Sequence, residues 1–246
     1  MKLDRIAGIA QRSKTLRDAM LRVASEFGEG RIELLFYGFF VHLHGRDRND
    51  TLICHTAPDK QEIVDAFLAA GGANTDIVAS KLEHIVEPYA IDIVAEADRM
   101  RETRDFRLAY IEKMLSYDVK TAWICAINDP WVGGYGVLNQ FYVDRFAEPA
   151  IAVSQLRAFA HKFHEEARRN GLLSKEIGLR ASQIELLANV AMGRSADDLA
   201  DRYCITTRAI EKRLENIRRR LRARNTLEAI YKATIYGVLP SAGGKS

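Results

Sequence analysis

Apolar residues recur along the chain with two different periods, and the changes of period separate helical from extended segments. A helical spacing of apolar residues within 13–27 predicts an amphipathic helix. The run 32–43 is aromatic and partly β-branched, and a polar turn separates it from a second run at 51–56, so we expect two paired strands. The same reasoning predicts helices at 59–70, 75–87, 90–101, 106–117 and 149–170, strands at 121–127 and 136–142, and a linker at 171–178.

A helix that is apolar on one side and cationic on the other is predicted at 206–221. Its apolar residues recur at i, i+4, i+7 and i+11 from Ile210 to Leu221, and Thr206 stands where an N-cap belongs. Preceded by a short helix and a tight turn, such a helix suits a reader of the DNA major groove, whereas the alternative is a solvated helix face. The opposite side carries Arg208, Lys212, Arg213, Arg218, Arg219 and Arg220.

Small and apolar residues surround this helix at regular spacings. They are Leu179, Leu186, Leu187, Ala191, Gly193, Ser195, Leu199, Ala200, Ile205, Thr206, Ile210, Ile217, Leu221, Glu228, Ala229, Gly237, Val238 and Leu239. Their order resembles the LuxR-type helix-turn-helix. Gly193 is expected at positive φ after a helix, and Ser195 is expected to cap the next one with Asp198 reaching back. The chain departs from the family's opening Leu-Thr-x-Arg-Glu, which reads Leu179-Arg-Ala-Ser182-Gln183 here.

The resemblance implies that the chain binds double-stranded promoter DNA as a dimer, with this helix in the major groove. The family's base-reading positions fall on Glu211, Lys212 and Glu215, where a carboxylate accepts from cytosine and lysine favours guanine. Alternatively, Glu211 pairs with Arg208 and Glu215 with Arg219 or Arg218 along the helix. The DNA-contacting residues expected from this resemblance are Thr207, Arg208, Glu211, Lys212, Arg213, Glu215, Arg218 and Arg219, of which Arg213, Arg218 and Arg219 meet phosphates.

The remainder of the chain resembles the sensor domain of LuxR-type regulators, so we expect an α+β fold. A PAS- or GAF-like α-β-α sandwich would occupy 1–170 as a sensor or dimerisation domain, and an all-α four-helix LuxR-type helix-turn-helix domain would occupy 179–246. The segment Tyr89-Ala-Ile-Asp92 resembles the family's aspartate segment, which binds the amide of an acyl-homoserine lactone. The ligand-binding candidates implied by this resemblance are Asp92, Tyr89 and Trp123.

The rest of a lactone site is missing from the sequence. The family's Trp and Tyr before the aspartate fall on Ala79 and Glu83, and its second Trp falls near Phe106 or Arg107. A lactone site needs an aromatic wall and an indole donor, so standard lactones are not expected to bind. The competing interpretation of Asp92 is a helix cap. There are two alternatives to a DNA-binding regulator that does not bind lactones. One is an acyl-homoserine lactone-responsive quorum-sensing regulator, and the other is a ligand or metal sensor acting through a protein partner.

Histidines and cysteines are common metal ligands, but their spacing in this chain does not favour a metal site. His42, His44, Cys54 and His55 cluster across the first hairpin, but no pair has zinc-finger spacing, so we expect structural residues and no metal or other cofactor. His161 and His164 are expected on an exposed helix face. The three cysteines, Cys54, Cys125 and Cys204, are expected to be reduced and buried.

Charge and missing motifs exclude other classes. Residues 171–246 carry 14 Lys and Arg against 8 Asp and Glu, and 1–170 is mildly acidic, which suits a tail that meets phosphate. No P-loop, Gly-x-Ser-x-Gly or His-Glu-x-x-His motif is present, so no enzyme is expected. Without a signal peptide or membrane span, the expected location is the bacterial cytoplasm, at the nucleoid. The chain also resembles the divergent VisN and VisR motility regulators, in which case a heterodimer with a paralogous regulator replaces the homodimer.

Overall fold

The chain forms two compact units, Met1–Asn170 and Gly171–Ser246. The computed structural model describes residues 4–27, 32–42, 49–72, 87–129 and 134–239. In the first unit, the elements are α1 (Asp4–Arg12), α2 (Leu16–Glu26), β1 (Leu34–His42), β2 (Asn49–Ala57), α3 (Gln61–Ala69), β3 (Tyr89–Asp92), α4 (Ile93–Thr103), α5 (Leu108–Leu115), β4 (Thr121–Ile124), β5 (Ala126–Asp129), β6 (Gly134–Tyr142) and α6 (Val153–Arg169). In the second, they are α7 (Leu172–Ile177), α8 (Ala181–Ala191), α9 (Ala196–Tyr203), α10 (Thr207–Arg220) and α11 (Thr226–Ile235).

An antiparallel sheet forms the centre of the first unit. Its strand order is β2-β1-β6-β4-β3, and β5 also pairs with β6. Strands β4 and β5 follow the same register along β6, with Trp123 opposite Gln140 and Ala126 opposite Val137. Between them, the backbone N–H of Cys125 donates to the side-chain oxygen of Asn139 at 3.3 Å. A mixed fold of helices and antiparallel sheet, as the sequence predicts, is therefore present.

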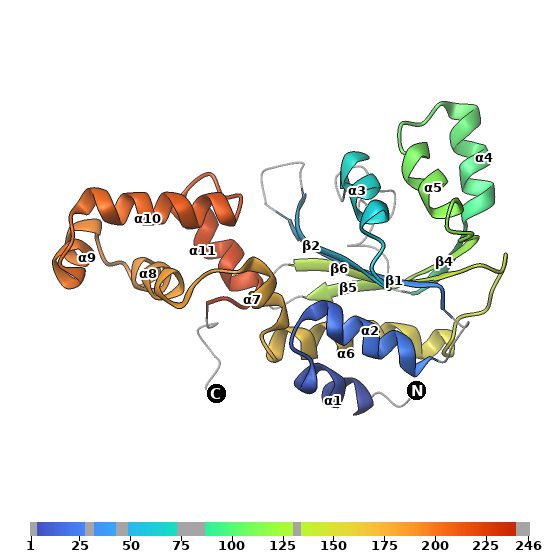
Figure 1. Ribbon diagram of the computed structural model, residues 1–246, viewed down its shortest axis with the longest axis horizontal. Coiled ribbons are helices and arrows are strands. Elements are labelled where there is room, and N and C mark those ends of the chain that lie inside the picture. The colour runs from blue at the N-terminus through green and yellow to red at the C-terminus, as the bar shows by residue number, and fades with distance from the viewer. Residues whose placement is uncertain (1–3, 28–31, 43–48, 73–86, 130–133, 240–246) are drawn as a thin grey trace. The chain divides into compact units, whose positions relative to one another are not determined.

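Helices cover both faces of this sheet (Figure 1). Alternate residues of β1 point to opposite faces, because side chains alternate along a strand. Phe36 and Phe40 lie in a core with Phe67 of α3, Met100 of α4 and residues of α5. On the other face, helices α1, α2 and α6 pack, and Tyr37 contacts Phe163 edge to face. Burial of an aromatic core of this kind is the main favourable term for the fold.

His164 corrects the expectation of an exposed histidine face on α6. Its side chain is buried, and its Nδ1 lies 2.7 Å from the hydroxyl oxygen of Tyr37. Phe39 also packs against the His164 ring, with 4.5 Å between the ring centroids. A buried tyrosine hydroxyl requires a hydrogen-bonding partner, and His164 supplies it across the interface between sheet and helix.

Three further expectations are wrong. The helix expected at 90–101 begins only at Ile93, because Tyr89–Asp92 pairs with β4 as a strand. The expected linker 171–178 contains helix α7, whose Leu172, Leu173 and Ile177 are buried. Cys204, expected to be buried, is exposed, whereas Cys125 is buried and Cys54 is half-buried. The helix expected at 75–87 lies, except for Glu87, outside the described residues.

The second unit is entirely helical over its described residues. Helix α10 contacts α8, α9 and α11, and α11 also contacts α8. The buried side chains of the unit include Leu187 of α8, Leu199 of α9, and Ile210 and Ile217 of α10. Over the described part of the whole chain, no helix combines the length and the apolar character needed to cross a bilayer.

Candidate nucleic-acid interface

Local capping positions α9 and α10. The Ser195 hydroxyl accepts from the backbone N–H of Asp198 at 3.1 Å, and the Asp198 carboxylate accepts from the Ser195 N–H at 3.0 Å. The Thr206 hydroxyl accepts from the N–H of Ala209 at 3.2 Å. The predicted caps Ser195 and Thr206 are confirmed, as is Gly193, whose φ is 85°. A Ser or Thr cap of this kind typically contributes about 1 kcal/mol.

A short turn joins α9 to α10. Cys204 adopts a left-handed conformation with φ of 51°, and its N–H bonds the Asp201 carbonyl at 3.2 Å. Two residues later, α10 begins after Thr206. The Thr207 hydroxyl at the start of α10 donates to the carboxylate of Asp197 on α9 at 2.7 Å. This bond links the two helices at their N-terminal ends, so Thr207 stabilises the helix pair.

Helix α10 is amphipathic, as its sequence predicts. Ile210 and Ile217 are fully buried, and Leu221 follows them at the end of the helix. On the outer side, Lys212 and Arg219 both bond the Glu215 carboxylate, at 2.7 and 3.0 Å. The hydrogen bond from Lys212, followed by that from Arg219, lowers the pKa of Glu215, so this carboxylate is ionised at neutral pH.

The charges of α10 differ in how they are paired. The predicted pair between Glu215 and Arg219 is confirmed. Arg208, Glu211 and Arg213 are exposed, and within the described part of the chain no ion pair joins Glu211 to Arg208. Glu211 is therefore available to a ligand without breaking an existing contact.

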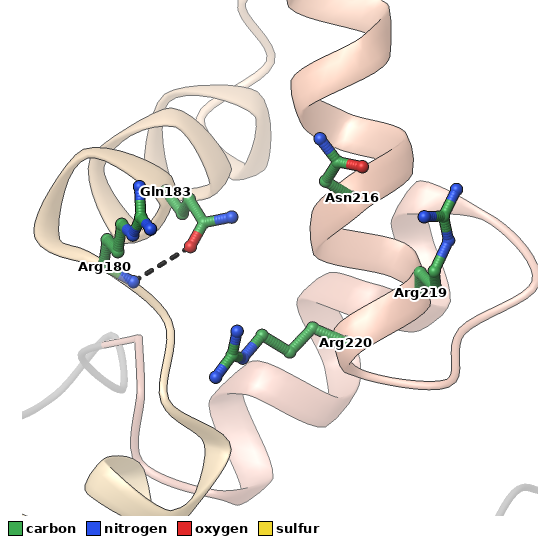
Figure 2. A pocket seen from close by; sticks show the side chains of 5 residues that line it. All are labelled: Arg180, Gln183, Asn216, Arg219 and Arg220. Atoms are coloured by element: carbon green, nitrogen blue, oxygen red, sulfur yellow. Dashed lines mark hydrogen bonds between the residues drawn. The ribbon is translucent and has the colours of Figure 1, made fainter.

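Two pockets lie along α10. The larger, about 570 Å³, brings together most of the predicted DNA-contacting residues. It is lined by Arg208, Glu211, Lys212, Leu214, Glu215, Arg218 and Thr226. The smaller, about 420 Å³, is lined by Arg180, Gln183, Asn216, Arg219 and Arg220 (Figure 2). Thr207 and Arg213 line neither of these two pockets.

A buried lysine of α11 that contacts the C-terminal end of α10 was not identified from the sequence. The Lys232 side chain is fully buried, and its Nζ donates to the carbonyls of Leu221 at 3.2 Å and Arg222 at 2.7 Å. It also pairs with Glu228 at 3.0 Å, and Arg224 bonds the same carboxylate. The only available signal was the spacing of Glu228 and Lys232 by four residues on a largely apolar helix.

The three ligand candidates of the first unit do not share one face of the sheet. Tyr89 packs against the core beneath α3, α4 and α5. Trp123 lies between the core residues Ala122 and Ile124 along β4, so its side chain lies on the opposite face of the sheet. Its indole N–H donates to the Ala147 carbonyl at 2.8 Å. The indole is thus already bonded to the backbone. Phe106, near the expected second Trp, is exposed, and Ala79 and Glu83 lie outside the described residues.

Asp92 is the cap of α4, so that interpretation of the residue is confirmed. Its Oδ1 accepts from the N–H groups of Val94 and Ala95 at 3.1 and 3.2 Å, and its Oδ2 bonds Arg145 at 2.8 Å. Burial raises the pKa of Asp92, but the bond from Arg145 and the helix N–H groups outweigh that effect and lower it. Both carboxylate oxygens are therefore engaged with the protein itself.

The histidine and cysteine cluster is described only in part. Cys54 and His55 lie on β2, opposite Gly38 and Tyr37 of β1. The side chain of His42 and all of His44 lie outside the described residues. Over the residues that are described, no three His, Cys, Asp or Glu side chains lie close enough to hold a metal ion.

Comparison with solved structures shows which fold the chain adopts. SdiA of Escherichia coli matches 97% of this chain and 98% of its own, with a TM-score of 0.53 and 13% identity. SdiA in complex with octanoyl-rac-glycerol matches over 97% and 96%, again with a TM-score of 0.53 and 13% identity. CepR2 of Burkholderia cenocepacia, described as an N-acylhomoserine lactone dependent LuxR family transcription factor, matches over 72% and 96%, with a TM-score of 0.50 and 17% identity. The chain shares their fold. No protein-family model and no curated protein matches it.

Proposed function

We propose that the chain is a sequence-specific DNA-binding transcriptional regulator of the LuxR type. The observation that carries this proposal is the outer face of α10, where a pocket is lined by Arg208, Lys212 and Arg218 together with Glu211 and Glu215. Helix α9, the short turn and α10 make the helix-turn-helix, and α10 enters the major groove, which is wide enough to admit one helix. The likeness in fold to CepR2 supports the same conclusion.

The two units divide this function between them. Residues 179–246 form the four-helix LuxR-type DNA-binding domain, and 1–170 form a PAS- or GAF-like sandwich that senses a ligand or holds a dimer together. One short helix contacts few base pairs, so two copies on adjacent half-sites supply the specificity that a promoter requires. The partners are thus double-stranded promoter DNA and a second copy, or a paralogous regulator of the VisN and VisR type, at the nucleoid.

Standard acyl-homoserine lactones are not the ligands in this proposal. Asp92, which stands where the family's amide-binding aspartate belongs, bonds two helix N–H groups and Arg145. The Trp123 indole bonds the backbone of Ala147 on the other face of the sheet from Tyr89. A lactone-responsive regulator is the second candidate, and it is favoured by the lactone dependence stated for CepR2.

A selection experiment tests the proposal. Purified full-length protein is mixed with sheared genomic DNA of its source, the bound fragments are sequenced, and recovered sites are measured by gel shift. We expect a short repeated motif, and we expect the charge reversals Lys212→Glu and Arg213→Glu to abolish the shift. Arg157→Glu on α6, an exposed arginine of the first unit, is the control and should leave the shift intact. Recovery of no enriched motif would refute sequence-specific binding and favour a sensor that acts through a protein partner.

A further inference from the structure

Three arginines from two helices surround a pocket beside the outer face of α10. The pocket, about 420 Å³, lies between the start of α8 and the second half of α10 (Figure 2). Its lining consists of the cations Arg180, Arg219 and Arg220 and the amides Gln183 and Asn216. None of these lining side chains is a carboxylate, so the pocket presents positive charge and hydrogen-bond donors together. This chemistry matches an anion with several oxygens.

The guanidinium of Arg220 is held in place before any ligand arrives. Its Nε donates to the carbonyl of Ile177 at 3.0 Å. Gly178 lies directly against it, because a Cβ at this position would come within 2.7 Å of Nη2. Gly178 also has a φ of +64°, which a side chain would strain. A guanidinium has five N–H donors, so the bond to Ile177 leaves its two Nη groups for an anion, at little further cost in side-chain entropy.

The start of α8 adds donors and a partial positive charge. Arg180 occupies the N-cap with no cap bond from its side chain, since a guanidinium has no acceptor. Gln183 instead accepts from the Arg180 N–H at 3.0 Å. The LuxR-type pattern has threonine here, whose hydroxyl would serve the helix N–H groups itself. With arginine, the side chain serves none of the first N–H groups of α8 and places a cation beside them, an arrangement that favours an anion.

We propose that this pocket binds one phosphate of the DNA backbone that borders the groove occupied by α10. The inference rests on the proposed function and names a contact within it. Asn216 follows Lys212 by one helical turn, so the pocket lies alongside the base-reading positions rather than beneath them. In the proposed complex, a DNA strand that borders the major groove passes on that side of the helix. Arg180, Asn216 and the Nη groups of Arg220 bind its phosphate, and Arg219, which is paired with Glu215 at the rim, adds its positive charge.

Salt dependence tests the contact without knowledge of the operator. Full-length protein is titrated with a fluorescent duplex of arbitrary sequence between about 50 and 200 mM salt, because a phosphate contact is independent of sequence. We expect Arg180→Gln to reduce the slope of log affinity against log salt by about 0.9 per bound chain. The ratio of the wild-type affinity to the affinity of this variant should then fall by about 3.5-fold across that fourfold range of salt.

Two further variants make the result specific. Asn216→Asp places a negative charge in the pocket and should weaken binding at least as much as Arg180→Gln. Arg157→Gln removes the same charge from the first unit and should leave the slope unchanged. Thermal unfolding of each variant, monitored by circular dichroism, should match the wild type, because the side chains of Arg180 and Asn216 are exposed and form no hydrogen bond or ion pair with the described residues.

Three results would overturn or redirect the inference, and they are distinguishable. If the wild type binds no duplex, the proposed function fails with it. If the wild type binds but Arg180→Gln keeps the full slope, the pocket makes no backbone contact and only the inference fails. Inorganic phosphate is the third arm: if it stabilises the wild type but not Arg180→Gln, while the DNA slopes stay equal, the pocket takes a free phosphate, and the DNA contact is again refuted.

Discussion

A single buried cation holds the C-terminal end of α10. Helix α10 is followed by its C-cap Leu221, and Arg222 then adopts a left-handed conformation with φ of 50°, which costs a residue with a side chain about 1–2 kcal/mol. Lys232, fully buried on α11, donates to both of their carbonyls. The last carbonyls of a helix have no partner within the helix, so the bonds from Lys232 offset the strain at Arg222 and fix how far α10 extends.

Lys232→Met keeps the volume of the side chain and removes its charge. The variant removes the Lys232 cation from the Glu228 side chain, which is 7% exposed and stays bonded to Arg224. It also removes the bonds from Nζ to the carbonyls of Leu221 and Arg222. Removing one partner of a buried ion pair costs about 3–5 kcal/mol, and the Arg224 contact places the expectation at the lower end, about 3 kcal/mol. For a unit the size of Gly171–Ser246, that loss corresponds to a fall in Tm of about 12 °C or more.

Differential scanning calorimetry of the full chain measures this loss, with Glu228→Gln and the double variant completing a cycle. We expect the double variant to be more stable than the sum of the two losses predicts, because neither charge is then buried alone. DNA affinity should fall for Lys232→Met as the end of α10 frays. A loss below about 1 kcal/mol, or strict additivity in the cycle, would show that Lys232 does not hold the helix end.

Three other outcomes are expected. Arg219→Ala should weaken binding equally on all sequences and lower the salt slope by about 0.9 in a fluorescence titration, whereas a loss confined to the specific site would contradict a phosphate contact. Glu211→Gln should relax the preference at one or two base pairs per half-site in a competition assay, more than Glu215→Gln does, because Glu215 already pairs with Lys212 and Arg219; an unchanged ranking of sites for both variants would rule out base readout. Acyl-homoserine lactones should produce no thermal shift, although a ligand at a hundred times its Kd would stabilise the fold by about 2.7 kcal/mol.

Features set by neighbours in the sequence could be predicted from it. The caps Ser195 and Thr206 and the positive φ of Gly193 each depend on a few adjacent residues, and all three are present. The amphipathic face of α10 follows from its period in the same way. Asp92 also belongs here, since a carboxylate at the start of a helix is well suited to bond its first N–H groups.

Features that depend on partners distant in the sequence could not be predicted from it. Tyr89–Asp92 is a strand only because β4 lies beside it, and four residues are too few for a period to distinguish strand from helix. His164 stands among polar residues in the sequence of α6, yet its Nδ1 lies 2.7 Å from the hydroxyl oxygen of Tyr37, 127 positions earlier in the chain. The expectation of a linker at 171–178 was wrong because Leu172, Leu173 and Ile177 are buried, and their burial stabilises helix α7 there.

The candidate site combines both kinds of feature. Most of the predicted contact residues lie along α10, where their spacing alone brings Arg208, Lys212 and Glu215 to one side. Arg180 lies on another helix, so only the packing of α8 against α10 places it near Asn216 and Arg220. Its signal in the sequence was a violated local rule, an arginine where a cap should be. Since folds tolerate such violations chiefly where a site benefits from them, an N-cap residue whose side chain serves no helix N–H group is explained by an anion that binds there.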